Sequence, residues 1–233
     1  MHEHADKQYE RELQRLKEMI LKGGGMVEEA ISWSMRALSE RSSTLAKALI
    51  QRDREIDRLE MEIDTLSIRL LALRQPTGPD LRFIAIGLKL STDLERIGDL
   101  AVNIAEQVLR LNREPPGAMP PQLLAMGEHA QLMVTTALEA FVLQDPEKAR
   151  EVCVMDDAVD EWNRELFQDL VAEEAPDVPN LAHRVRLIFI ANALERIADH
   201  ATNLAEDVIF IVQGLDIRHG TLLGRIGKDA PPG

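Results

Sequence analysis

Apolar residues recur every three or four positions over most of this chain. Between residues 90 and 111 the spacing alternates between four and three, the heptad pattern of a helix that packs against neighbouring helices. The residues in this pattern are Leu90, Leu94, Ile97, Ala101, Ile104, Val108 and Leu111. No segment reads as a strand with alternating apolar and polar positions. The pattern therefore predicts an all-α protein.

Breaks that contain proline divide the helical pattern into segments. Three of them stand out, at residues 74–80, 113–121 and 174–180, and a weaker one lies at 143–146. Proline ends helices and keeps the residue before it away from helical angles. We therefore expect six helices, at about residues 5–40, 44–74, 80–112, 121–144, 147–174 and 179–213.

Three consecutive glycines, at residues 23–25, interrupt the pattern of the first expected helix. Each glycine in a helix interior costs about 1 kcal/mol relative to alanine. We expect a local bend or break at this point. The alternative is that the glycines allow another helix to approach closely.

The third and sixth expected helices share one sequence pattern. Residues 94–108 read LERIGDLAVNIAEQV, and residues 194–208 read LERIADHATNLAEDV. The second and fifth helices are related as well, through residues 49–57 and 151–160. The repeat thus extends over two sets of three helices, which indicates a tandem duplication of a three-helix bundle. The expected units are a first bundle at 1–113, a second bundle at 120–213 and a C-terminal tail at 214–233.

Each half carries pairs of acidic residues spaced four apart on its second and third helices. Residues four apart lie on one face of a helix. The two helices are joined by a short break and should run antiparallel. A rise of about 1.5 Å per residue then places their acids at one level, about 30 Å from the turn. The acids are Asp53, Asp57, Glu95 and Asp99 in the first half, and Asp156, Asp160, Glu195 and Asp199 in the second.

Four carboxylates at one level repel one another unless a positive group joins them. Ligands that are all oxygen suit hard cations such as Mg²⁺, Mn²⁺, Ca²⁺ or iron, so the sequence predicts a metal site in each half. Two alternatives stay open. Arg96 and Arg196 could make the acids part of an ion-pair network, or the acids could form an ordinary solvated face.

The histidines add little to this picture. We expect His129, His183 and His200 to be polar surface residues rather than metal ligands. The two acidic helices carry no ExxH sequence of the kind that di-iron carboxylate bundles use, which argues against an oxygen-activating enzyme.

The amino-acid composition excludes some classes of binding partner and some structural features. The formal net charge of −13 repels nucleic acid phosphates, so we expect no nucleic-acid binding. The single cysteine, Cys153, excludes an intrachain disulfide. No apolar run reaches the roughly 18 residues of a membrane span, and the N-terminus lacks the apolar core of a signal peptide. These features lead us to expect a soluble intracellular protein.

The repeated segments resemble the PhoU family, the phosphate-specific transport system accessory proteins of bacteria. The resemblance covers about residues 8–220. It is carried by DLERIGDLAVNIAE at 93–106, ALERIADHATNLAEDV at 193–208 and VQGLDIRH at 212–219. The last segment is similar to the family's G-x-x-x-R-H ending, here Gly214, Arg218 and His219.

The resemblance implies two PhoU-type bundles and a cytoplasmic negative regulator of phosphate uptake and of the phosphate-starvation regulon. It implies contact with the ATPase subunit of the phosphate ABC transporter and with a sensor histidine kinase. We expect a homodimer that meets the membrane only through these partners and is not an enzyme.

The resemblance also implies metal ions on the eight carboxylates, with iron, manganese, magnesium or zinc as candidates. Asp93 is replaced by Ala193 in the second copy, so the two sites would differ in affinity. Two rival interpretations are a carboxylate-bridged metalloenzyme and a helical scaffold whose acids are only solvated.

Overall fold

The computed structural model describes residues 2–172 and 178–217. Within these ranges it contains six α-helices and no β-strand. The helices are α1 (His2–Ser39), α2 (Ser43–Arg74), α3 (Gly78–Leu111), α4 (Pro121–Leu143), α5 (Pro146–Ala172) and α6 (Val178–Gln213). The predicted all-α fold is confirmed, and each helix begins and ends within three residues of its expected position. No helix in the described ranges is apolar over enough of its length to cross a bilayer.

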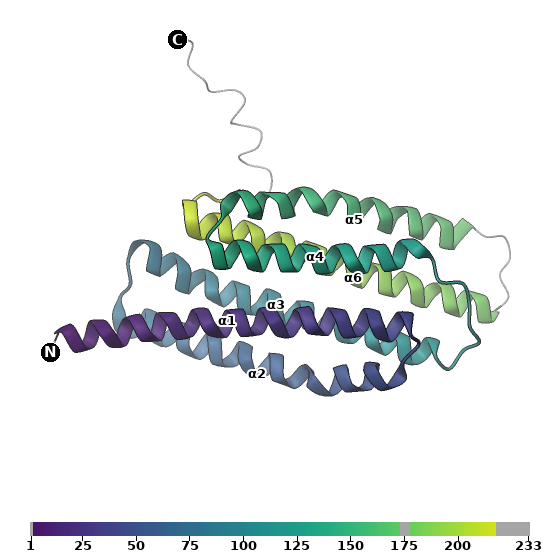
Figure 1. Cartoon of the computed structure of the whole chain (residues 1–233), viewed down its shortest axis with the longest axis horizontal. Coiled ribbons are helices and arrows are strands. Elements are labelled where there is room, and N and C mark those ends of the chain that lie inside the picture. The colour runs from purple at the N-terminus through teal and green to yellow at the C-terminus, as the bar shows by residue number, and fades with distance from the viewer. Residues whose placement is uncertain (1, 173–177, 218–233) are drawn as a thin grey trace, which may run out of the picture.

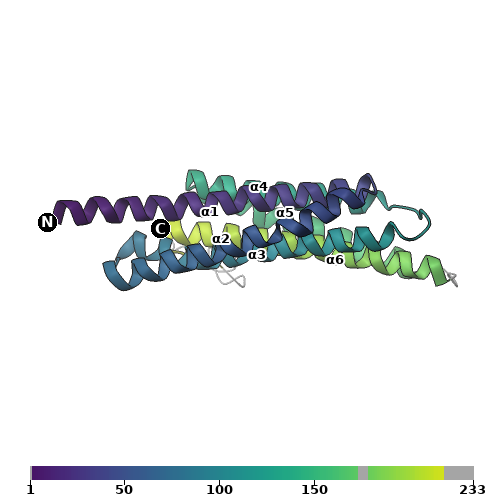
Figure 2. The same cartoon turned by 90° about the horizontal axis from the view of Figure 1, so that it is seen from below.

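The six helices form two three-helix bundles that lie side by side (Figure 1). Helices α2, α3, α6 and α5 lie next to one another in that order, and α1 packs on α2 and α3 while α4 packs on α5 and α6. Since α1 also contacts α4, both lie on the same side of this layer (Figures 1 and 2). No helix of the described residues covers the other side, which we call the open face.

The two central helices, α3 and α6, carry the core of their own bundles and also pack against each other. All seven heptad residues of α3 are buried, as are their counterparts in α6. Burying one such aliphatic side chain contributes roughly 1.5–3 kcal/mol, so these two seams are a main source of stability. The counterparts are Ile190, Leu194, Ile197, Ala201, Leu204, Val208 and Ile211.

Helix α1 continues without a break through its three glycines (Figure 1). A Cβ atom on Gly23 would lie 3.3 Å from Leu94 of α3, and one on Gly24 would lie 2.6 Å from Leu138 of α4. The prediction of a bend or break is therefore wrong, and the alternative is correct. Glycine at these two positions lets side chains of α3 and α4 lie directly against the backbone of α1.

The packing of α3 on α6 is antiparallel and includes a buried polar pair (Figure 1). The imidazole Nδ1 of His200 lies 2.8 Å from the carboxylate Oδ1 of Asp93, and both residues are 7% exposed. His183 is also buried, and its Nε2 lies 3.1 Å from the carbonyl oxygen of Ala118. The prediction of surface positions is therefore wrong for both histidines, because each has its polar partner on another segment.

The polar pair has no counterpart at the positions of the α3–α6 interface that the repeat relates to it. The repeat relates each residue of α3 to the residue 100 positions later in α6. Applied to Asp93 and His200, this relation gives Ala193 and Leu100, which are both apolar and buried. The change from Asp93 to Ala193 that is visible in the sequence is thus matched by the change from Leu100 to His200.

Candidate metal centres

The eight acidic residues lie on the open face of the molecule. Helix α3 is covered by α1 and flanked by α2 and α6, so its exposed residues can only face the remaining side. Asp99 is exposed on α3, and Asp199 is exposed on α6. We call Asp53, Asp57, Glu95 and Asp99 the first carboxylate group, and Asp156, Asp160, Glu195 and Asp199 the second.

The first carboxylate group is close enough together for its charges to act on one another. Burial raises the pKa of Asp53, and the charges of Asp57 and Asp99 raise it further. Burial also raises the pKa of Glu95, to about 7, with added repulsion from Asp99, Glu60, Asp57 and Asp53. The packing of α2 against α3 therefore brings these acids to one level, as the spacing predicts.

Glu60 is a neighbour that the prediction left out of this group. Its charge acts on Glu95, and its Oε1 accepts a hydrogen bond of 3.2 Å from the Thr92 hydroxyl on α3. Glu60 follows Asp57 by three positions, which puts it on the same helix face. The spacing between Asp57 and Glu60 could therefore have identified Glu60 as a member of this cluster from the sequence.

In the second carboxylate group, pKa values are raised by the same two causes, burial and mutual repulsion. Burial raises the pKa of Asp156 to about 6, followed by repulsion from Asp199 and Asp160. Burial also raises the pKa of Glu195, with repulsion from the other three acids and a smaller opposing effect of Arg196. The Thr202 hydroxyl on α6 acts in the opposite direction, because a hydrogen bond to the Asp156 carboxylate lowers its pKa.

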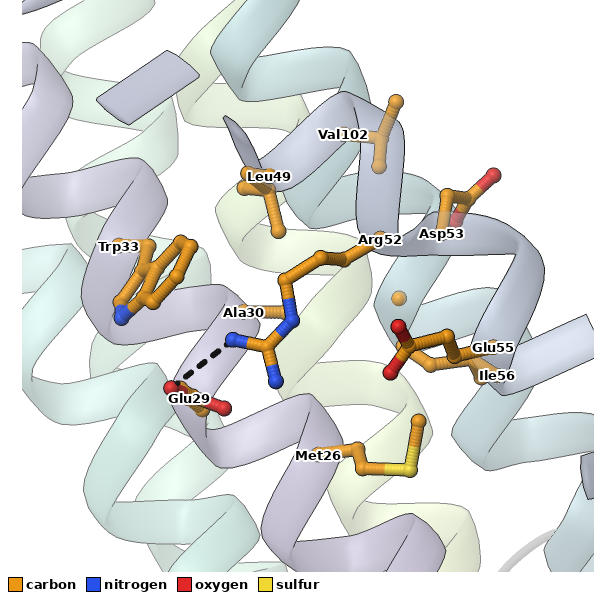
Figure 3. A pocket seen from close by; sticks show the side chains of 11 residues that line it. Met26, Glu29, Ala30, Trp33, Leu49, Arg52, Asp53, Glu55, Ile56 and Val102 are labelled. Carbon is orange, nitrogen blue, oxygen red and sulfur yellow. Dashed lines mark ion pairs between the residues drawn. The ribbon is translucent and has the colours of Figure 1, made fainter. Parts of the chain in front are cut away.

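The described residues do not form the ion-pair network that was one alternative. In residues 2–172 and 178–217, no ion pair within 4.0 Å joins Arg96 or Arg196 to either carboxylate group. Arg52 precedes Asp53 in the sequence, but its ion pair is with a residue outside the carboxylate groups. Figure 3 shows its guanidinium directed at Glu29, 3.0 Å away, and it lies 4.8 Å from the ring centre of Trp33.

The donor set of each group fits a hard cation by its chemistry. All donors are carboxylate oxygens, and their pKa values are raised by burial first and by mutual repulsion second. Nowhere in the described part of the chain do three or more acidic, histidine or cysteine side chains already stand in metal-binding positions. Binding would therefore require the carboxylates to turn towards one another, and the metal sites stay a prediction.

Other residues singled out in the sequence lie elsewhere. The ring of His129 packs edge-on against Trp162, and its Nε2 lies 3.1 Å from the Met155 carbonyl oxygen. Gly214 adopts a φ of +69° just after α6. Arg218 and His219, which complete the expected C-terminal motif, lie outside the described residues.

Comparison with known proteins agrees with this architecture. The PhoU domain matches the chain twice, at residues 20–108 and 123–208. A phosphate-specific transport system accessory protein PhoU homolog of Zymomonas mobilis is 37% identical over 226 residues, which are 97% of this chain and 94% of the relative. A homolog of the same name from Pseudomonas aeruginosa is 36% identical over 219 residues, 93% of this chain and 90% of the relative.

Solved structures show the same fold. The crystal structure of PhoU from Pseudomonas aeruginosa superposes with a TM-score of 0.86 at 34% identity, over 89% of this chain and 100% of that one. The phosphate transport system regulatory protein PhoU from Streptococcus pneumoniae superposes with a TM-score of 0.82 at 28% identity, over 89% and 98%. With two matching domains, relatives that span nearly its whole length and two related structures, the chain belongs to the PhoU family.

Proposed function

We propose that this protein is a cytoplasmic negative regulator of phosphate uptake and of the phosphate-starvation regulon. The observation that carries the proposal is the double match to the PhoU domain over a shared fold. Its relatives are named as accessory proteins of the phosphate-specific transport system, and one of the related structures is titled a regulatory protein of that system.

The proposed mode of action is contact with two partners, the ATPase subunit of the phosphate ABC transporter and a sensor histidine kinase. The open face supports this mode because it carries both carboxylate groups on one side of the molecule. Together with the net charge of −13, such a face attracts basic protein surfaces and speeds their association.

The proposal includes one cation site in each half, held by the first and second carboxylate groups. Bound cations would neutralise charge that the fold otherwise holds at a cost, as the raised pKa values of Glu95 and Asp156 indicate. A cation that binds only the folded chain also stabilises it by mass action.

Deleting the gene in its host tests the regulatory proposal. In a strain without a second homologue, phosphate-starvation genes should stay on in high phosphate, and a plasmid copy should switch them off again. A reporter that shuts off normally without the protein would show that the proposal is wrong.

A further inference from the structure

Beside the second carboxylate group, the open face carries large apolar side chains that are exposed. Phe167 on α5 is 51% exposed, while Val185 and Phe189 on α6 are 40% and 57% exposed. We call these three residues the apolar patch. Two of the five phenylalanines of the protein lie in it.

The apolar patch continues the line of the carboxylates along both helices. Asn163 and Asn192 meet across α5 and α6 at 3.4 Å, one helical turn beyond the second carboxylate group. Phe167 follows Asn163 by one more turn on the same helix face. Because the two helices run antiparallel (Figure 1), Phe167 comes level with residue 188, between Val185 and Phe189.

The first half shows that the fold does not need aromatic residues at the positions of Phe167 and Phe189. The repeat aligns Phe167 with Asp64, Val185 with Ala85, and Phe189 with Lys89. Asp64 accepts a hydrogen bond of 3.2 Å from the Ser91 hydroxyl, and Lys89 lies 2.6 Å from Asp207 across the seam. The same helix pair is thus built with polar groups in one half and with exposed aromatic rings in the other.

Exposed aromatic side chains are typical anchors of protein–protein interfaces, where they fill pockets and lose contact with water. The charge around the patch determines what could cover it. Four carboxylates repel nucleic acid, anionic lipid and the same acidic face of a second copy. A divalent ion bound to the group would still leave a net negative charge.

We propose that the apolar patch and the second carboxylate group together dock an amphipathic helix of a partner protein. Its apolar side covers Phe167 and Phe189, and its Lys and Arg residues face the carboxylates. The inference rests on the proposed function, in which the protein acts through protein contacts, and it names the surface that makes one of them.

The test uses the full chain with the residues of its own first half. The variant F167D/F189K places Asp and Lys where the first half has Asp64 and Lys89. A control variant, Leu132→Lys, changes an apolar residue that is 53% exposed on α4, the helix packed on the opposite side of the layer. Circular dichroism melting should show both variants folded.

Binding is measured by calorimetry against two purified probes, the transporter ATPase subunit and the cytoplasmic part of the sensor kinase. F167D/F189K should bind at least one of them about tenfold more weakly, while the control binds as the parent does. The parent's affinity for that probe should also fall as salt rises, because the docking charges are complementary.

Three results would overturn the inference. If the parent binds neither probe, both the proposed function and the inference fail. If the parent binds and F167D/F189K binds equally well, the inference alone fails. If the substitutions instead abolish self-association in light scattering, or binding to anionic vesicles, with the affinity for both probes unchanged, the patch serves a second copy or a membrane.

Discussion

At the scale of single residues, the carboxylate groups oppose folding when they are fully ionised. Burial and mutual repulsion both favour the protonated form, which is why the pKa values of Glu95 and Asp156 rise to about 7 and about 6. A cation or a basic partner would reverse this effect by compensating the charge.

The raised pKa of Glu95 predicts that the metal-free protein loses stability as pH rises from about 4.5 to about 7. In this window the folded chain holds more protons than the unfolded chain, so the free energy of unfolding falls with rising pH. Denaturant unfolding in EDTA measures the slope. Glu95→Gln should make the slope shallower than in the parent, and identical slopes would contradict the prediction.

A second residue-scale prediction concerns the cation sites. Mn²⁺ or Fe²⁺ should raise the melting temperature of the parent, because a bound ion stabilises only the folded state. Asp99→Ala and Asp199→Ala should each reduce this rise, whereas Glu62→Ala, an exposed residue outside both groups, should not. If parent and variants melt alike under every metal condition, the carboxylates are a solvated face.

At the scale of single helices, the three glycines of α1 have different surroundings. A Cβ on Gly25 would meet nothing within 4 Å, whereas one on Gly24 would lie 2.6 Å from Leu138. The chain accepts the low helix propensity of Gly24 because α4 packs there, and nothing in the contacts of Gly25 requires a glycine.

We therefore expect Gly25→Ala to stabilise the protein by about 1 kcal/mol, the difference in helix propensity. Gly24→Ala should gain less or should destabilise, because Leu138 must move. Urea unfolding of both variants measures the two effects. Equal stabilisation would show that α4 does not constrain this position.

At the scale of the whole molecule, polar contacts across the α3–α6 seam hold the two bundles in register. The Asp93–His200 pair is buried, and the Lys89–Asp207 pair has one buried partner. Both join residues that belong to different halves of the repeat. Together with the buried apolar residues of α3 and α6, they help to hold the two carboxylate groups in place relative to each other on the open face.

His200→Leu should destabilise the protein by about 1–3 kcal/mol, because it leaves the buried carboxylate of Asp93 without its donor. The double variant D93A/H200L should recover much of this loss. It copies Ala193 and Leu100, which occupy the related positions of the same interface. Denaturant unfolding of the single and double variants checks the prediction, and a double variant no more stable than His200→Leu would contradict it.

The sequence by itself determined the six helices, their division into two related sets and the common level of the acids in each set. These features depend on local spacing, because heptad seams, proline breaks and the rise per residue act within one helix or between helices joined by a short turn. Even Glu60 could have been found from its spacing to Asp57.

Only the tertiary structure decided which helices from the two halves lie together. The antiparallel packing of α3 on α6 buries His200 against Asp93, and α4 lies close to Gly24. It also places both carboxylate groups on one open face, with the apolar patch beside the second. Such contacts join residues roughly a hundred positions apart, and they depend on the fit of side chains from separate helices, which no periodicity within one helix encodes.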